Sequence, residues 1–261
     1  MQELAWLFDP LFLSIKVVLC QGLLLAIFGL ALAYFLAFSS SKFKAVAEMI
    51  VTFPLIFPPI ATGFLLLYLL GKNGIIGKAL NLEIVFSFKA LVIAAFIASL
   101  PLFVKPVASA LSSLSKSLSE AAYSLGKSKF QTAILVLFPS IAKSVAAAFI
   151  LALSRGLGEV GITLILGGNI IGKTDTISLA IYNAVYDGRS DQALALSFVL
   201  VVLSFILFFI INLLEKSRNQ KKQKWREDER IELPTRRSTA QSSGLKPVSI
   251  TRLLYPPCVL F

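Results

Sequence analysis

Residues 17–38 read VVLCQGLLLAIFGLALAYFLAF and contain no charged side chain. A helix needs about 20 mostly apolar residues to cross the hydrocarbon core of a bilayer, so this stretch is long enough to span a membrane. The composition agrees, because 57% of the 261 residues are hydrophobic and the mean hydropathy is +0.82. Both values lie outside the usual range of soluble domains. The sequence therefore predicts an integral membrane protein.

Four more apolar runs follow the first, at residues 45–70, 84–111, 133 into the 150s, and 193–214. Together the five runs predict an all-α, polytopic membrane protein with about five transmembrane helices. Prolines interrupt the second run at Pro54, Pro58 and Pro59, and the third at Pro101. Such breaks either line a pore or act only as packing kinks, and the sequence leaves both interpretations open.

The chain becomes polar and strongly basic after the last run. We expect a transmembrane domain over residues 1–215 and a disordered cytoplasmic tail over residues 216–261, because basic segments next to membrane helices tend to stay in the cytoplasm. The loops around 71–83 and 168–191 are then outside, and the loop around 116–129 is inside. The run KKQKWR at 221–226 predicts contact with anionic lipid, and we expect no nucleic-acid partner.

GGNIIGKT at residues 167–174 matches the phosphate-binding pattern G-x-x-x-x-G-K-T, and ITLIL at 162–166 resembles the strand that precedes such a loop. The predicted orientation places this loop outside, where ATP is not supplied. The chain left over after five spans is also too short for a nucleotide-binding domain. We interpret the match as coincidence, with a membrane-bound ATPase as the alternative. Two cysteines and no histidine predict no metal, and we expect no cofactor in this chain.

The loop after the third run reads SLSEAAYSLGKSKFQTAILVLFP, residues 117–139. Apolar side chains at i, i+3, i+4 and i+7 predict one stripe of a short helix; they are Leu118, Ala121, Ala122 and Leu125. We expect Gly126 to end that helix and Pro139 to start the next membrane helix. The pattern predicts a helical hairpin on the cytoplasmic face, with small alanines that let a partner approach closely.

This segment resembles the coupling loop of ABC importer permeases, whose pattern is E-A-A, three residues, G, nine residues, then I-x-L-P. Glu120, Ala121, Ala122, Gly126 and Pro139 occupy the matching positions. The resemblance to permeases of the molybdate and sulfate group extends to about residue 215, through residues 53–77, 99–107 and 154–182. GKNGIIG at 71–77 favours molybdate over sulfate.

The resemblance implies a type I ABC importer permease in the bacterial cytoplasmic (inner) membrane. Its partners would be a second copy of this chain, two cytoplasmic ATPase subunits docked on the coupling loops, and an external oxyanion-binding protein. Molybdate would be the substrate, with tungstate and sulfate as alternatives, and the permease would need no catalytic residue. Glu120 would cap its helix or pair with a basic residue of a partner. A membrane scaffold that transports nothing is a further alternative.

Arg155 and Glu159 lie four residues apart, so on a continuous helix they would share a face and form an ion pair. Ionisable residues at membrane depth favour a functional role, and Gly158 between them allows a helix break, which makes these three residues our pore or gate candidates. A purely structural ion pair remains the alternative. If the helix starts at Pro139, Arg155 lies about 24 Å along it, which suits an outer gate.

Overall fold

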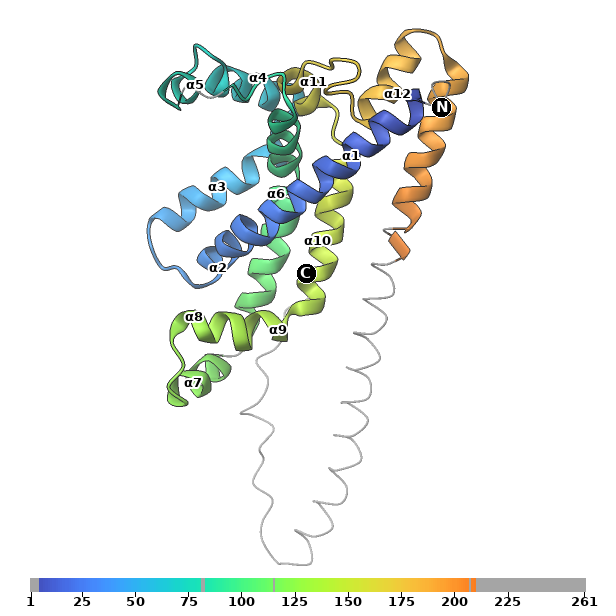
Figure 1. Cartoon of the computed structure of the whole chain (residues 1–261). Helices are drawn as coiled ribbons and strands as arrows, with labels where there is room; N and C mark the ends of the chain where they lie inside the picture. Colours follow the sequence, from blue (N-terminus) through green and yellow to red (C-terminus); the bar gives the residue numbers. More distant parts are fainter. Residues whose placement is uncertain (1–4, 81–82, 115, 207, 210–261) are drawn as a thin grey trace, which may run out of the picture. The chain divides into compact units, whose positions relative to one another are not determined.

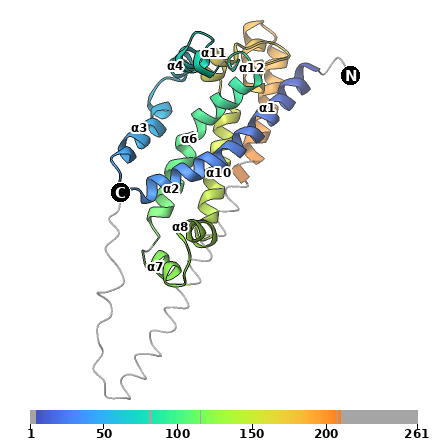
Figure 2. The same ribbon diagram turned by 60° about the vertical axis from the view of Figure 1, so that its left-hand side comes forward.

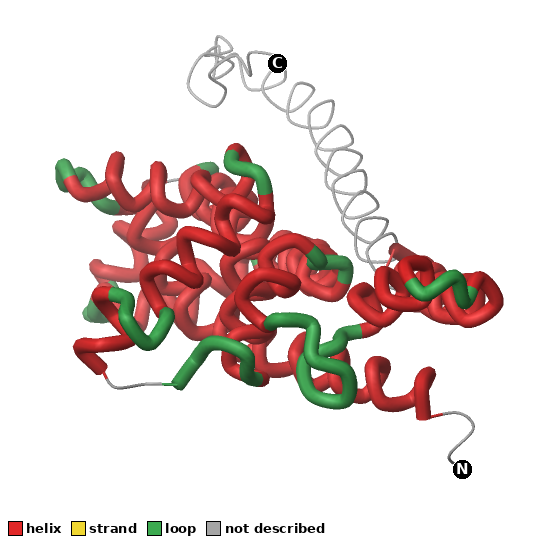
Figure 3. The backbone as a smooth tube through the Cα atoms, turned by 90° about the horizontal axis from the view of Figure 1, so that it is seen from above, coloured by secondary structure: helices red, strands yellow, loops and turns green. Residues whose placement is uncertain are grey.

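The computed structural model describes residues 5–80, 83–114, 116–206 and 208–209. Within these ranges the chain forms helices joined by short loops, and no strand occurs there (Figures 1 and 3). The predicted all-α class is therefore confirmed. The predicted tail at 216–261, and its boundary with the transmembrane domain, lie outside the described residues.

The first helix is longer than its apolar run. It comprises α1 (Ala5–Leu24), a π-helical turn (Leu25–Gly29) and α2 (Leu30–Phe38), and so begins well before residue 17. Gly29 closes the π turn against another helix, because an added Cβ there would lie 2.6 Å from the Phe103 ring. π turns of this kind occur as single insertions within α-helices.

The second predicted span, residues 45–70, is not one helix. The structure contains α3 (Phe43–Ile56) and α4 (Pro59–Leu70), separated by Phe57 and Pro58 in extended conformations with ψ of 144° and 135°. A residue before proline is driven out of the α region, and here two consecutive residues precede prolines. The apolar span continues instead from α4 through α5 (Ile75–Leu80), over Pro59–Lys78.

Helix α6 (Phe88–Ser112) is the centre of the described fold (Figure 2). It packs against α1, α2, α3, α10 and α11. Its side chains Phe103, Val104, Val107 and Leu111 are fully buried in the largest apolar cluster. Helix α6 therefore joins helices from both halves of the chain.

The second half of the chain contains a sharp bend. Helices α8 (Lys129–Thr132) and α9 (Phe138–Ser140) flank a π turn (Ala133–Leu137), and α10 follows (Ala142–Leu157). The segments Lys129–Ser140 and Ala142–Leu157 meet at 78°. Helix α10 therefore starts at Ala142, after the bend, and the prediction that it starts at Pro139 is wrong.

Three helices of the described ranges are long and apolar enough to cross a membrane, namely Trp6–Phe38, Pro59–Lys78 and Phe88–Ser112; counting the bent pair as one span gives four. Two short helices, α11 (Gly161–Gly167) and α12 (Ile177–Tyr186), precede a last apolar helix, Ser190–Ile206. The fifth predicted run, 193–214, is thus helical as far as it is described.

The loops that carry the predicted sites lie at opposite ends of α6 and α10. Helix α7 (Lys116–Ser124) and α8 follow the C-terminal end of α6, and α11 lies beside its N-terminal end (Figure 1). The N–H of Phe86, just before α6, donates to the carbonyl of Leu166 in α11 at 3.0 Å. This arrangement agrees with the predicted placement of the two loops on opposite sides of a membrane.

Candidate functional site

The turn after α7 has a defined helix-ending geometry. Gly126 has a φ of +75°. Its N–H donates to the Tyr123 carbonyl at 2.9 Å, and the Lys127 N–H donates to the Ala122 carbonyl at 3.1 Å. These are the two hydrogen bonds of a Schellman motif. The prediction that Gly126 ends the helix is confirmed, and since no heavy atom lies within 4 Å of an added Cβ, the backbone angle alone requires glycine.

The next helix begins immediately with a capping box. The Ser128 hydroxyl accepts from the Gln131 N–H at 3.2 Å, and the Gln131 side chain accepts from the Ser128 N–H at 3.1 Å. Each bond satisfies an N–H that would otherwise lack a partner at a helix start. With one motif ending α7 and another starting α8, the turn between them is held by hydrogen bonds at both sides.

The hairpin of α7, α8 and α9 has an inner and an outer face. Ala122 is buried, and Leu118 packs against the main apolar cluster. Ala122 thus faces the rest of this chain. The sequence had predicted that this small side chain lets a partner approach, and for Ala122 that prediction is wrong. Leu125, the last member of the predicted stripe, is 80% exposed, because it lies beyond the last residue of α7 where the chain turns at Gly126.

The outer face combines charge with exposed apolar side chains. Its exposed residues include Glu120, Tyr123, Leu125, Lys127 and Phe130. Glu120 lies in the middle of α7, so it does not cap that helix. Its carboxylate makes no hydrogen bond or ion pair with the part of the chain that is described. Its other predicted role, pairing with a basic side chain of a partner, stays a prediction.

Pro139 connects this hairpin to the membrane helix. It lies in α9, two residues before the bend at Ile141, whose φ and ψ are −109° and 12°. The hairpin therefore lies across the end of α10 (Figure 1). A force on the outer face of the hairpin would act directly on α10.

At the other end of α10, Arg155 and Glu159 form the predicted ion pair, with 2.5 Å between Nη1 and Oε2. The helix does not continue between them as expected. It ends at Leu157, and Gly158 is its C-terminal cap. From Ala142, Arg155 lies about 20 Å along the helix. The ion pair thus spans the end of the helix at a break formed by Gly158.

Glu159 has a second partner that the sequence did not indicate. Its Oε1 accepts from the Ile162 N–H at 2.7 Å, at the start of α11. The Glu159 side chain is 1% exposed and that of Arg155 is 34% exposed. Buried charges require a partner and hydrogen bonds, and Glu159 has both. Its carboxylate ties the end of α10 to the beginning of α11.

Close glycine contacts hold the neighbouring helices. An added Cβ at Gly161 would lie 2.6 Å from the Cβ of Pro59, and one at Gly156 would lie 2.1 Å from Gln21 Oε1. Gly158 has no such close contact. Of the three glycines around the ion pair, Gly156 and Gly161 therefore allow close contact between helices, and Gly158 allows α10 to end.

Gln21 is fully buried, and it was not among the residues predicted from the sequence to be functional. Its Nε2 donates to the Ser99 hydroxyl at 2.9 Å and to the Ala152 carbonyl at 3.0 Å. These bonds join α1, α6 and α10. A single glutamine inside the uncharged run 17–38 was the available signal, because a polar side chain at membrane depth needs a partner.

The loop at 167–174 does not have the geometry of a phosphate-binding loop. Residues 162–166 belong to helix α11 and not to a strand. The loop N–H groups are used internally: Ile170 donates to the Thr174 hydroxyl, Gly172 to the Asp175 carboxylate, and Thr174 to the Ile170 carbonyl. Few donors are left to hold a phosphate.

Asp175 ends this loop and is nearly inaccessible to solvent. Burial raises the pKa of its carboxyl above the usual value; the N–H groups of Asp175 and Gly172 oppose that shift, and the negative charge of Asp9 adds to it. The Asp175 carboxylate accepts from the Gly172 N–H at 2.9 Å, so Asp175 stabilises the fold of this loop.

We expect Lys173→Ala to leave transport unchanged, because Lys173 is exposed on this loop. Thr174→Val is the matched variant, because the buried Thr174 hydroxyl donates to the Gly167 carbonyl at 2.8 Å. Loss of this hydrogen bond should lower the free energy of unfolding by about 1 kcal/mol or more. Substrate uptake and thermal unfolding of the purified protein measure the two effects. If the loop bound phosphate, Lys173→Ala would abolish uptake, and that result would contradict this prediction.

The described residues thus form a bundle of apolar helices with a capped hairpin across one end and a buried ion pair at the other. Residues 27–220 match the family model described as binding-protein-dependent transport system inner membrane component. The chain belongs to this family, which makes it a multi-pass membrane permease of an ABC importer.

Individual relatives agree with the family. The chain is 35% identical over 191 residues to the probable transport system permease protein NifC of Clostridium pasteurianum, a match that covers 72% of this chain and 66% of that protein. It is 34% identical over 203 residues to the molybdenum transport system permease protein ModB of Haemophilus influenzae, covering 76% and 87%.

A solved structure supports the fold. A chain of the MetNI methionine ABC transporter in an inward facing conformation superposes with a TM-score of 0.64 at 16% identity. The match covers 83% of this chain and 98% of that chain. At this identity the likeness concerns the fold alone.

Proposed function

We propose that this chain is the permease subunit of an importer that uses ATP hydrolysed by separate subunits to move a tetrahedral oxyanion, molybdate. The observation that carries the proposal is the hairpin capped at Gly126 and Ser128, whose outer face is exposed and whose end joins α10. The similarity to ModB supports molybdate. Tungstate and sulfate are the alternatives within the same family.

The partners follow from this proposal. Two copies of the chain enclose one pathway in a bacterial inner membrane, and an external binding protein delivers the oxyanion. An ATPase subunit docks on each hairpin. Tyr123, Leu125 and Phe130 supply the exposed apolar area, and Glu120 offers a carboxylate to a basic side chain. Aromatic side chains often anchor such contacts. The chain itself needs no cofactor.

Coupling then has a mechanical route. The caps at Gly126 and Ser128 keep the hairpin rigid, so that closure of the ATPase pair moves it as a unit. The bend at Ile141 transfers this movement to α10. At its far end α10 carries Arg155, and the pair with Glu159 across the break at Gly158 responds to the movement. These three residues form the proposed gate.

The proposal is tested with the assembled transporter in proteoliposomes that contain ATP, with the external binding protein outside. We expect uptake of labelled molybdate that stops when internal ATP is omitted, and that unlabelled molybdate or tungstate suppresses more strongly than sulfate. Stronger suppression by sulfate would show that sulfate, and not molybdate, is the substrate. Hydrolysis of ATP by the purified chain alone would contradict the proposal, because it would place the motor in this chain.

A further inference from the structure

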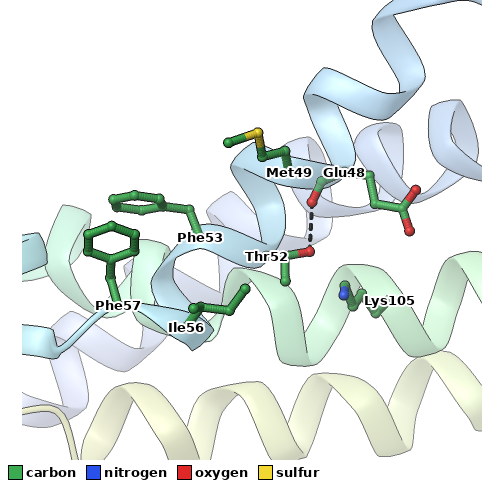
Figure 4. A pocket seen from close by; sticks show the side chains of 7 residues that line it. All are labelled: Glu48, Met49, Thr52, Phe53, Ile56, Phe57 and Lys105. Carbon is green, nitrogen blue, oxygen red and sulfur yellow. Dashed lines mark hydrogen bonds between the residues drawn. The ribbon is translucent and has the colours of Figure 1, made fainter.

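An open groove of about 310 Å³ runs between α3 and α6 (Figure 4). Its lining residues are Glu48, Met49, Thr52, Phe53, Ile56, Phe57 and Lys105. All except Lys105 belong to α3 or to its C-terminal cap, and Lys105 lies on α6. The groove therefore brings together one face of α3 and a single basic side chain of the central helix.

Lys105 marks the point where α6 becomes accessible. No residue from Ala90 to Val104 is exposed, whereas Lys105 and Pro106 are. Lys105 lies seven residues before Ser112, the last residue of α6, or about 10 Å from that end. A charge at such depth is costly in lipid and nearly always faces a bundle interior or a water-filled cavity.

The charge of Lys105 is not neutralised by the described part of this chain, where no salt bridge to its ammonium is found. Glu48 lines the same groove, and its carboxylate also lacks an ion pair there. Only the backbone carbonyl of Glu48 is engaged, by the Thr52 hydroxyl at 2.7 Å (Figure 4). An ammonium that is not ion-paired, in a groove between two apolar helices, is suited to a mobile anion.

Away from Lys105, the lining of the groove is mostly apolar (Figure 4). The Phe53 and Phe57 rings stack with centroids 4.1 Å apart, and Ile56 lies between them in sequence. Apolar walls lower the local dielectric, which strengthens the attraction between an ammonium and a dianion. Glu48 adds a competing negative charge, which would prevent the anion from binding so tightly that it cannot leave.

We propose that Lys105 binds the oxyanion inside the membrane during transport, as a substrate-binding residue in the groove between α3 and α6. This inference rests on the proposed function, since it assigns a contact to the substrate of that importer. The contact is electrostatic and requires no bond to form or break. Lys105→Met keeps the length of the side chain and removes its charge, and Lys105→Arg keeps the charge.

The test uses the assembled transporter in proteoliposomes. We expect Lys105→Met to lower the initial rate of labelled molybdate uptake about tenfold, as expected for a lost contact to a charged group. Lys105→Arg should retain most of the rate. The control is Lys89→Met, because Lys89 is also exposed on α6 but lies near its opposite end; it should not change uptake. ATP hydrolysis stimulated by the loaded binding protein should persist in all three variants.

The outcomes separate the inference from the function it rests on. Absence of molybdate uptake by the unaltered transporter would overturn the proposed function. Normal uptake by the unaltered protein and by Lys105→Met would overturn the role of Lys105 alone. The assay is run in phosphatidylcholine vesicles with and without phosphatidylglycerol. An effect of Lys105→Met confined to vesicles with the anionic lipid would show that Lys105 serves lipid headgroups, and would also overturn the inference.

Discussion

Gly126→Pro is expected to abolish ATP-driven uptake while the chain remains inserted in the membrane. Proline has a φ near −65° and no N–H, whereas Gly126 has a φ of +75° and donates to the Tyr123 carbonyl. Because proline cannot adopt this backbone conformation, the substitution costs more than about 1 kcal/mol at the turn and opens the hairpin. Uptake should fall more than about tenfold, because each 1.4 kcal/mol of lost docking energy is a factor of ten.

The chain offers a matched control for this variant. Gly188 has a φ of +73° and no heavy atom within 4 Å of an added Cβ. Its N–H donates to the Val185 carbonyl, and the Arg189 N–H donates to the Ala184 carbonyl, which is the same motif after α12. Gly188→Pro should therefore disturb an equal turn away from the hairpin.

Co-purification of the ATPase subunit with the permease is the decisive measurement. We expect it to be lost in Gly126→Pro and kept in Gly188→Pro. Glu120→Lys, which reverses one charge on the outer face without touching the turn, should weaken the same association. Unchanged co-purification and uptake in both hairpin variants would refute the coupling role of the hairpin.

The second large effect concerns the ion pair at the end of α10. Arg155→Met leaves the carboxylate of Glu159 buried without its cation. Breaking a buried pair in this way costs about 3 to 5 kcal/mol, and we expect the lower end because Arg155 is 34% exposed. Glu159→Gln should cost less, because the amide oxygen still accepts from the Ile162 N–H. Thermal unfolding of the purified variants checks this order.

The double variant Arg155→Met/Glu159→Gln separates a gate from a structural pair. It contains no unpaired buried charge at this position, so its stability should exceed that of Arg155→Met alone. We expect uptake to stay low in the double variant, because a gate formed by Arg155 and Glu159 needs both charges. Recovery of uptake together with stability would assign the pair to the structural alternative.

Local sequence patterns predicted the features that depend on neighbours along the chain. The end of α7 at Gly126 follows from the φ that glycine tolerates, and the pair of Arg155 with Glu159 follows from their separation of four residues. The composition was sufficient for the membrane class. The break at Phe57 and Pro58 was signalled by its prolines, although the sequence left their role open.

Other features lay beyond such patterns. The start of α10 at Ala142 depends on how the hairpin packs against the bundle, and the burial of Ala122 depends on the same packing. The bond between Glu159 and the Ile162 N–H exists only because Gly158 ends the helix.

The sequence by itself determined that this protein is a helical membrane protein with a cytoplasmic hairpin that turns at Gly126, because apolar runs and helix ends are properties of consecutive residues. Only the tertiary structure decided that Gln21 joins three helices and that Lys105 shares a groove with Glu48. The partners in these contacts are far apart along the chain. Their meeting is set by the packing of α1, α3 and α10 around α6, which no local pattern of residues encodes.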